Sequence, residues 1–394
     1  MMTEKTVHFI TLRKNEERRI LSGHQWIFSN EILAASNALQ SGDVVEIRRC
    51  DGKFLGCGFY NPNSLIAVRF LSPVVEEITT AFFEKRIRTA LALRMKLYPT
   101  STTFRVVHGE SDFLPGLIID KFNDFLSVQT FSAGMDIHLN SICDALEQIF
   151  SPRGIIERNE SPSRQLENLP VRKNILRGTI EPTVIDFNGI KFQIDILEGQ
   201  KTGFFLDQRE NRAALKLFVH NQTVLDCFCN EGGFGIHAAF FGAASVESVD
   251  ISEPAISKAR ANAQLNGLNN ISFRTGDVFE ILKQAVEENK KYNVIVLDPP
   301  SFTKSKKNIQ QAIKGYREIN TNGLKLIAEG GTLATASCSH HIDDETFLNI
   351  VRDSAVKAGR KIQLLHFAGA ASDHPTLPAM PETKYLKFAL FNVE

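Results

Sequence analysis

The second half of the chain alternates short apolar strands with amphipathic helices, and this rhythm constrains the fold more than any other feature. Five strand-like segments, from TVLDCF (223–228) to GTLATAS (331–337), are separated by segments of helical periodicity. Such alternation is typical of a doubly wound α/β sheet with mostly parallel strands. Two further strands, KIQLLHFAG and YLKFALFNV, follow with only a polar, Pro-rich loop between them, so the last strand is predicted to run antiparallel.

Aspartates stand at or just after the ends of four successive strands, where ligands of open parallel sheets bind. They are Asp226, Asp250, Asp277 and Asp298. Gly232 and Gly233 follow the first strand and allow a tight turn with close approach of a ligand. The turn has neither the GxGxxG spacing nor a basic residue for a pyrophosphate, so a cationic, phosphate-free cofactor is predicted rather than a dinucleotide. S-adenosylmethionine is such a molecule.

Each strand-end aspartate has an expected role, although a single one is more often a helix cap or turn former. Asp250 is placed to accept both ribose hydroxyls, and Asp277 to meet the adenine amino group. The predicted cofactor-binding residues are Asp226, Phe228, Gly232, Gly233, Asp250, Ile251, Asp277, Val278 and Asp298. Thr202 and Arg209 are added because they belong to a polar segment, GQKTGFFLDQRENR, just before the first strand of the sheet.

The fourth strand ends in LDPPSF, which points to the acceptor site. Pro299 and Pro300 fix φ and make the turn rigid, so it can hold a carboxylate against a flat substrate. Phe302 is placed to stack on that substrate, and Lys304, in the basic KSKKN segment, to contact phosphates.

Cys338 is the predicted nucleophile because it ends the fifth strand at the edge that also carries Asp298. Carbon 5 of a pyrimidine becomes nucleophilic enough to accept a methyl group only after a thiolate has added to carbon 6. Asp298 is then placed to hydrogen-bond the ring edge. The competing interpretation is that Cys338 is a small buried apolar residue, as most free cysteines are. His340 and His341 lack partners at ligand spacing, so no metal site is expected.

The first half of the chain is organised differently. Residues 1–73 form short alternating runs broken by turn signals, and a helical connector is expected over 76–98. Strands and one helix follow, and the polar segment ESPSRQLENLPV is predicted to be an exposed loop. We therefore expect a β-rich domain over 1–73, a connector and central α+β domain over 74–186, and the cofactor-binding domain over 187–394.

Taken in order, these motifs resemble the family of class I ribosomal RNA methyltransferases related to the large-subunit cytosine-5 enzyme. GHQWIFSNEI and GFYNPNSLIAVRFLS are similar to its N-terminal PUA domain, and GLIIDKFND and ERNE to its central domain. GQKTGFFLDQRENR, VLDCFCNEGGFGIHA, VLDPPSF and SCSHH are similar to its catalytic motifs. The resemblance implies a Rossmann-like methyltransferase domain, large-subunit rRNA as the partner and 5-methylcytosine as the product.

The whole-chain properties exclude several other classes of protein. Lys plus Arg and Asp plus Glu both number 45, so any RNA surface must arise from local charge separation. There is no apolar leader or membrane-length run, and the six cysteines show no zinc-like spacing, so a cytoplasmic protein is expected. A homodimer is compatible with the sequence.

Three alternatives to the cytosine-5 reaction stay open at this stage. The same fold can methylate carbon 5 of uracil, and an Asp-Pro-Pro turn followed by an aromatic residue also suits methylation of a purine nitrogen. The third alternative is a non-catalytic RNA-binding assembly factor.

Overall fold

The computed structural model describes residues 8–199, 202–303 and 308–394, which form two compact units. The first unit comprises residues 1–185, 194–206 and 372–383, and the second comprises 186–193, 207–371 and 384–394. Lys304 lies outside the described residues. No helix in the described ranges is long and apolar enough to cross a bilayer.

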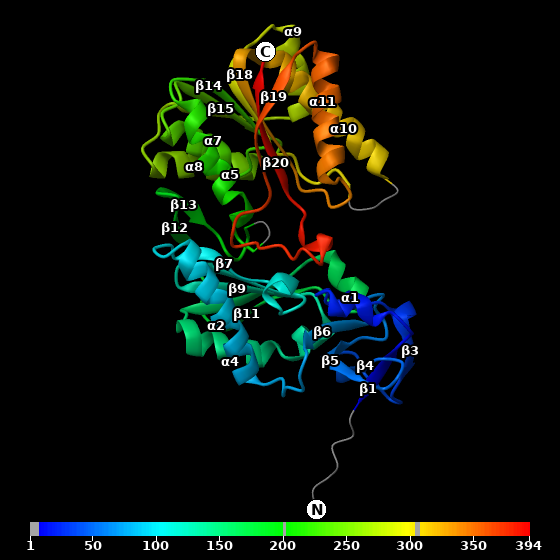
Figure 1. Ribbon diagram of the computed structural model, residues 1–394. Helices are drawn as coiled ribbons and strands as arrows, with labels where there is room; N and C mark the ends of the chain where they lie inside the picture. The colour runs from blue at the N-terminus through cyan, green and yellow to red at the C-terminus, as the bar shows by residue number, and fades with distance from the viewer. Residues whose placement is uncertain (1–7, 200–201, 304–307) are drawn as a thin grey trace, which may run out of the picture. The chain divides into compact units, whose positions relative to one another are not determined.

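The first unit contains two sheets (Figure 1). The sheet nearer the N-terminus has the order β2-β6-β5-β4-β1-β3. Its strands are β1 (Phe9–Leu12), β2 (Trp26–Ile27), β3 (Ile32–Ala35), β4 (Val44–Arg48), β5 (Phe54–Tyr60) and β6 (Val68–Ser72), with the short helix α1 (Glu17–Leu21). Alternate residues Ile10, Leu12, Val45 and Ile47 are buried, as the alternating sequence pattern requires.

The second sheet of this unit has the order β11-β10-β9-β8-β7. Its strands are β7 (Thr103–His108), β8 (Leu117–Phe122), β9 (Phe125–Thr130), β10 (Gly154–Asn159) and β11 (Arg172–Gly178). The helices that accompany it are α2 (Thr80–Leu97), α3 (Ala133–Ile137) and α4 (Leu139–Phe150). Helix α2 is the expected connector, and Phe82, Phe83 and Ile87 bury its apolar face in the core of this sheet. A hairpin of β12 (Thr183–Phe187) and β13 (Ile190–Ile194) follows the sheet in the chain.

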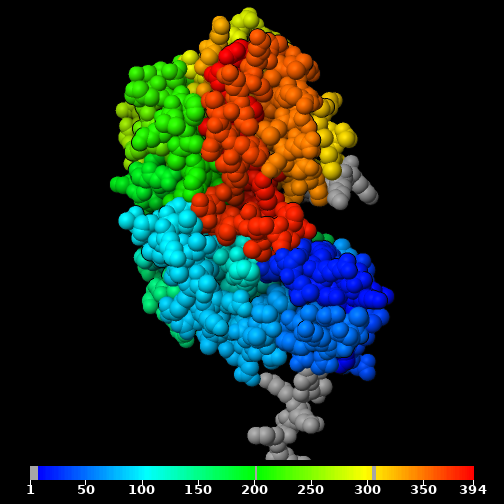
Figure 2. Space-filling view, viewed as in Figure 1, coloured from blue at the N-terminus to red at the C-terminus, as the bar shows by residue number. Residues whose placement is uncertain are grey.

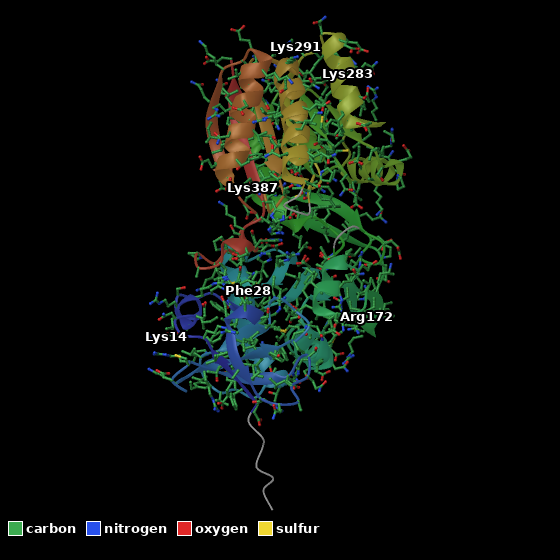
Figure 3. The ribbon with its side chains drawn as sticks, turned by 90° about the vertical axis from the view of Figure 1, so that its right-hand side faces the viewer. Lys14, Phe28, Arg172, Lys283, Lys291 and Lys387 are labelled. Carbon is green, nitrogen blue, oxygen red and sulfur yellow. The ribbon has the colours of Figure 1, made fainter. Side chains whose placement is uncertain are left out.

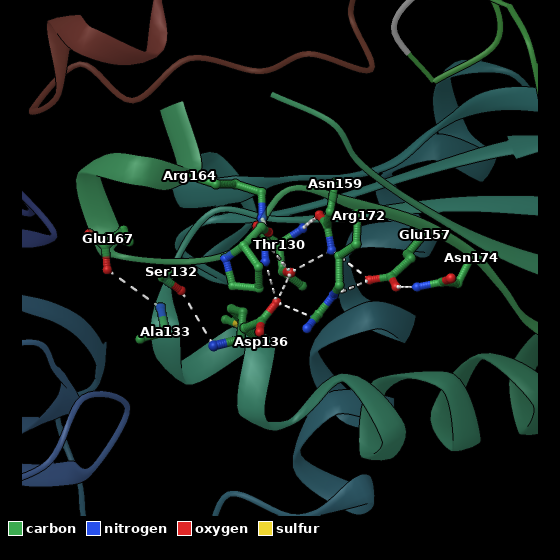
Figure 4. A network of polar contacts seen from close by, with 12 residues as sticks. Thr130, Ser132, Ala133, Asp136, Glu157, Asn159, Arg164, Glu167, Arg172 and Asn174 are labelled. Atoms are coloured by element: carbon green, nitrogen blue, oxygen red, sulfur yellow. Dashed lines mark hydrogen bonds and ion pairs between the residues drawn. The ribbon is translucent and has the colours of Figure 1, made fainter. Parts of the chain in front are cut away.

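The segment ESPSRQLENLPV is exposed at most of its residues, as predicted, but it is not simply a loop. Residues Pro162–Glu167 form a short 3₁₀ helix whose Arg164 and Glu167 are buried. The Arg164 guanidinium binds Asp136 at 2.9 Å and donates to Thr130, within a network that also includes Glu157 and Asn159 (Figure 4). Polar residues alone do not mark a surface loop, because buried charges are tolerated when they are paired.

The second unit contains a seven-stranded sheet of order β16-β15-β14-β17-β18-β20-β19. Its strands are β14 (Thr223–Cys227), β15 (Ser245–Asp250), β16 (Ile271–Thr275), β17 (Tyr292–Leu297), β18 (Ile327–Ser337), β19 (Ile362–Ala368) and β20 (Lys387–Val393). The pairings among β14 to β18 are parallel, whereas β20 runs antiparallel to both β18 and β19. The predicted doubly wound sheet with an antiparallel last strand is confirmed.

Helices cover both faces of this sheet. The helices of this unit are α5 (Arg209–Ala214), α6 (Lys216–Val219), α7 (Gly233–Phe240), α8 (Glu253–Leu265), α9 (Val278–Glu287), α10 (Ile309–Leu326) and α11 (Asp344–Ala358). Leu225 packs with residues of α9, α10 and α11, whereas its neighbour Val224 packs with residues of α6 and α7. Figure 2 shows α11 and β19, in orange and red, side by side on one surface of this unit.

Candidate active site

Asp226 lies at the end of β14 and fastens the start of α7 to the sheet. Its side chain is fully buried, and its Oδ2 accepts a hydrogen bond from the backbone N–H of Gly235 at 2.7 Å. A Cβ at Gly235 would collide with the Ser248 hydroxyl and lie 2.8 Å from the same Oδ2. The glycine is therefore required for the close approach of the helix to the carboxylate.

The turn between β14 and α7 contains three residues with left-handed backbone conformations. Phe228 has φ 62°, Asn230 has φ 47°, and Gly232, the residue before α7, has φ 88°. Such conformations are costly for residues other than glycine and occur often at ligand-binding turns. A Cβ on Gly233 would lie 2.7 Å from the Arg212 guanidinium, so the turn closes onto that side chain.

Burial and charge shift the titration of the groups beneath this turn. Burial raises the pKa of Asp226 to about 7, although the Gly235 hydrogen bond opposes the rise, and nearby Asp298 adds to it. Burial lowers the pKa of Arg212 to about 10 against the attraction of Asp207, Asp298 and Asp226. Among the described residues, none donates a hydrogen bond to the buried Oδ1 of Asp226. A buried carboxylate with an unused oxygen suits a cationic ligand that can donate hydrogen bonds.

Asp250, at the end of β15, is held by backbone donors on both sides. Its Oδ2 accepts from Asn230 N and its Oδ1 from Ser252 N, both at 2.9 Å. The next side chain, Ile251, is 70% exposed. An oriented carboxylate beside an exposed apolar side chain fits the ribose and base of an adenosyl group.

Asp277 and Val278 begin α9 after β16. Asp277 is exposed and acts as the N-cap of the helix, because its Oδ1 accepts from Phe279 N at 2.7 Å. Val278 is buried among the residues of the sheet core. The carboxylate thus has the structural role expected of an isolated strand-end aspartate, and its contact with adenine stays a prediction.

Thr202 and Arg209 fall in different units. Thr202 belongs to the first unit, where it is buried and donates to Asp120 at 2.5 Å. Arg209 begins α5 in the second unit and lies with its guanidinium 4.1 Å from the centre of the Phe187 ring. Of these two residues, only Arg209 lies in the unit that carries the strand-end aspartates.

The Asp-Pro-Pro turn follows β17 as expected. Asp298 is half-buried, Pro299 is buried and Pro300 is exposed. The Phe302 ring packs 4.6 Å from the Tyr316 ring and 5.9 Å from the Phe279 ring, measured between ring centroids. These contacts hold the turn against α10, and stacking of Phe302 on a substrate stays a prediction.

Cys338 directly follows β18, and its side chain is only partly buried. Strands β17 and β18 are parallel, with Leu297 opposite Thr335, so Asp298 and Cys338 emerge at the same sheet edge. Cys227 and Cys229 are buried, and burial raises the pKa of both thiols well above their usual value. Cys338 is the cysteine best placed to meet a substrate at this edge.

Two residues that the sequence did not single out complete the surroundings of Cys338. The Tyr316 hydroxyl lies 3.0 Å from the hydroxyls of both Ser337 and Ser339. Lys387, the first residue of β20, is 3% exposed and lies opposite Ser337 (labelled in Figure 3). A lysine within the apolar segment YLKFALF was the sequence signal that could have identified it.

Comparison with known families defines the class of protein. Residues 10–73 match the PUA-like domain family, and residues 173–392 match the S-adenosylmethionine-dependent methyltransferase family. The chain belongs to the latter family, and its cofactor is S-adenosylmethionine.

The chain is also similar over nearly its whole length to individual methyltransferases. The chain is 42% identical over 386 residues to Ribosomal RNA large subunit methyltransferase I of Aeromonas salmonicida, covering 96% of this chain and 98% of the relative. It is 40% identical to the protein of the same name from Shewanella denitrificans, covering 96% and 97%.

Two solved structures share the fold. A putative methyltransferase from Streptococcus mutans superposes with a TM-score of 0.82 at 23% identity, covering 98% of this chain and all of that chain. A putative methyltransferase complexed with SAH superposes with a TM-score of 0.84 at 22% identity, covering 97% and 99%.

Proposed function

We propose that this protein methylates carbon 5 of a cytosine in large-subunit ribosomal RNA through a covalent bond between Cys338 and the pyrimidine. The observation that carries the proposal is the position of a partly exposed thiol at the sheet edge that also holds Asp298. The names of the relatives and the PUA-like match support ribosomal RNA as the substrate, and we propose that the reaction takes place in the cytoplasm.

The cofactor is held by groups at the ends of β14 and β15. Gly232 and Gly233 let the turn pack closely against Ile236 and Arg212, the Asp226 carboxylate would attract the cationic part of the cofactor, and Asp250 would accept hydrogen bonds from the ribose hydroxyls. The exposed side chain of Ile251 would cover one side of the adenosyl group. Bound S-adenosylmethionine supplies an electrophilic methyl group on its sulfonium.

The side chains at β17 and β18 then act on the pyrimidine, which must leave its stack to enter the site. The Cys338 thiolate adds to carbon 6, and the electron pair of the carbon 5–carbon 6 double bond becomes available at carbon 5. Carbon 5 takes the methyl group and loses its proton to a base. The returning electron pair re-forms the double bond and expels the thiolate. Asp298 accepts a hydrogen bond from the exocyclic amine, which favours cytosine over uracil at this position.

The test is mass mapping of large-subunit rRNA from cells that lack the protein. Wild type is expected to restore one 5-methylcytosine, and Cys338→Ala is expected to restore none while retaining S-adenosylmethionine binding. Cys50→Ala, which removes an exposed cysteine of the other unit, is the matched control and is expected to restore the mark. Full methylation by Cys338→Ala, or a methyl group on a nitrogen, would contradict the covalent mechanism.

A further inference from the structure

Lys387 places a buried ammonium group beside the strand end that carries Cys338. Its Nζ donates to the backbone carbonyls of Ser339 and Tyr385, each at 2.8 Å. Ser339 is the residue after Cys338, and Ser337, the residue before it, faces Lys387 across the β18–β20 pairing. The ammonium is thus fixed by the carbonyl of the residue after the cysteine and by that of Tyr385.

Burial of a charged lysine in this position costs free energy unless the charge interacts with another group. Burial lowers the pKa of Lys387 to about 8, and Cys338 is the strongest of the groups that oppose this fall. The two nearby carboxylates have other partners: Asp344 pairs with Lys384, and Asp343 caps α11 through Thr346 N. Two of the three ammonium hydrogens reach carbonyls, and the attraction between the ammonium and Cys338 is electrostatic.

We propose that Lys387 is a positioning residue that holds Cys338 as a thiolate before the substrate arrives. A fixed cation in a water-poor site stabilises a neighbouring anion far more than a solvated one does. The thiol proton passes to solvent, and the lysine keeps its own proton throughout. The same charge stabilises the thiolate when it is expelled from the product. This inference rests on the proposed function, since it concerns the nucleophile of that reaction.

The other titratable groups around the thiol do not supply this charge. Burial raises the pKa of Tyr316 to about 12 against the hydrogen bonds to Ser337 and Ser339, with small contributions from Cys338 and Asp298, so the phenol stays neutral. The pKa of His340 is lowered by burial and by Lys387 and His341, which favours the neutral imidazole. Lys384 is exposed and paired with Asp344.

The test is the pH dependence of Cys338 alkylation by iodoacetamide in the full chain without RNA, followed by peptide mass spectrometry. Lys387→Met is expected to slow modification of Cys338 at pH 7 about tenfold and to move the midpoint of the profile upward by about one pH unit. Lys387→Arg is expected to retain most of the wild-type reactivity. Cys50, which is exposed, is the internal reference within each sample.

S-adenosylmethionine binding and a thermal melt show whether each variant is folded, and Lys387→Gln replaces Lys387→Met if the latter does not fold. A profile for Cys338 that is unchanged in the folded neutral variant overturns the proposal. The outcome is distinguishable from failure of the proposed function, because thiol reactivity is measured without methyl transfer.

A second feature of this domain is independent of the thiol: a groove of about 430 Å³ along α10. Its charged lining consists of Lys283, Lys314, Arg317, Lys325, Lys357 and the single acid Glu318. One of these residues, Lys283 of α9, is labelled in Figure 3. Five cations against one acid is a local separation of charge in a chain whose formal net charge is zero.

The lining of the groove also includes a buried threonine and a paired arginine. Thr321 lines it and is 3% exposed, yet within the described residues its hydroxyl has no hydrogen-bond partner. Arg317 pairs with Asp353 at 2.7 Å, which orients its guanidinium but neutralises part of its charge. Lys314 and Lys325 are eleven residues apart on α10, which is about 16 Å along the helix.

We infer that this groove binds the phosphate backbone of the RNA substrate beyond the base that reacts. The spacing of the cations along α10 suits several successive phosphates of one strand. This inference, too, rests on the proposed function.

Binding of a fragment of large-subunit rRNA measured against salt concentration tests the groove. The double variant Lys314→Glu and Lys325→Glu is expected to reduce the slope of log affinity against log salt by about 1.5 to 2, whereas exposed Lys361→Glu leaves it nearly unchanged. An unchanged slope in the double variant overturns the inference. The same unchanged slope for RNA is expected if the groove binds an acidic protein instead. Methyl transfer to carbon 5 is read separately, so the two proposals fail independently.

Discussion

The two units handle buried charge in opposite ways. In the first unit, buried arginines pair directly with carboxylates, as Arg94 does with Asp112 at 2.5 and 2.6 Å. Arg164 and Arg172 both bind Asp136 in the network of Figure 4. At the sheet edge of the second unit, Asp226 and Lys387 are instead held by backbone groups, and burial shifts the pKa of each toward the neutral range.

The difference separates stabilising charges from charges available to a ligand. A buried ion pair whose members satisfy one another contributes order to the fold but has little capacity left for a ligand. A carboxylate or ammonium that is fixed by backbone groups keeps its charge directed at whatever enters the site. The comparison therefore predicts that substitutions in the first unit change stability, whereas those at the sheet edge change binding and catalysis.

The largest effect is expected from breaking a pair in the first unit. Arg94→Ala leaves Asp112 buried without its partner, so we expect unfolding of this unit to cost about 3–5 kcal/mol less. Chemical denaturation followed by circular dichroism measures the loss. Arg88→Ala on the same helix removes an exposed pair with Glu84 and should cost no more than about 0.5 kcal/mol. Equal losses of unfolding free energy in both variants would show that the buried pair stabilises the unit no more than the exposed pair does.

An intermediate effect is expected at the turn after β14. Gly235→Ala forces a methyl group against Asp226 and Ser248, and such overpacking typically costs about 1–3 kcal/mol. We expect S-adenosylmethionine affinity, measured by calorimetry, to fall at least about tenfold. Gly369→Ala is the matched control, because a Cβ there lies 3.6 Å from its nearest neighbour, an ordinary contact. Unaltered affinity in Gly235→Ala would mean that the cofactor does not depend on this turn.

The smallest effect concerns pH. The pKa of Asp226 is raised to about 7, so the carboxylate is ionised above that pH and becomes protonated as the pH falls through it. Affinity for the cationic cofactor should therefore weaken by about tenfold between pH 8 and pH 6. Asp226→Asn should bind more weakly at pH 8 and show a flat profile. A wild-type profile that is also flat would remove Asp226 from the binding of the cationic group.

The sequence predicted those parts of the fold and site that depend on local pattern. The strand–helix alternation, the antiparallel last strand and the strand-end positions of Asp226, Asp250 and Asp298 all follow from periodicity and topology rules. Asp277 shows the limit of such a pattern, since it caps α9 in the manner of an ordinary strand-end aspartate.

The parts that could not be predicted depend on contacts between distant segments. Arg212 lies against the Gly233 turn, and Lys387 lies opposite Ser337, only because the sheet topology brings these segments together. The same reason explains the error at Arg164, whose partner Asp136 lies 28 residues earlier in the chain. The sequence around a polar residue does not show whether its side chain will bind a buried partner or be solvated by water.

The most direct test of the central claim is a covalent trap with an rRNA fragment that carries 5-fluorocytidine at the mapped nucleotide. Fluorine replaces the proton that must leave carbon 5, so the bond to the thiol cannot be released after methyl transfer. The account predicts a stable protein–RNA adduct, dependent on S-adenosylmethionine, whose cross-linked peptide contains Cys338 and whose base has gained one methyl group. Turnover of the fluorinated RNA without an adduct, or an adduct at another residue, would contradict it.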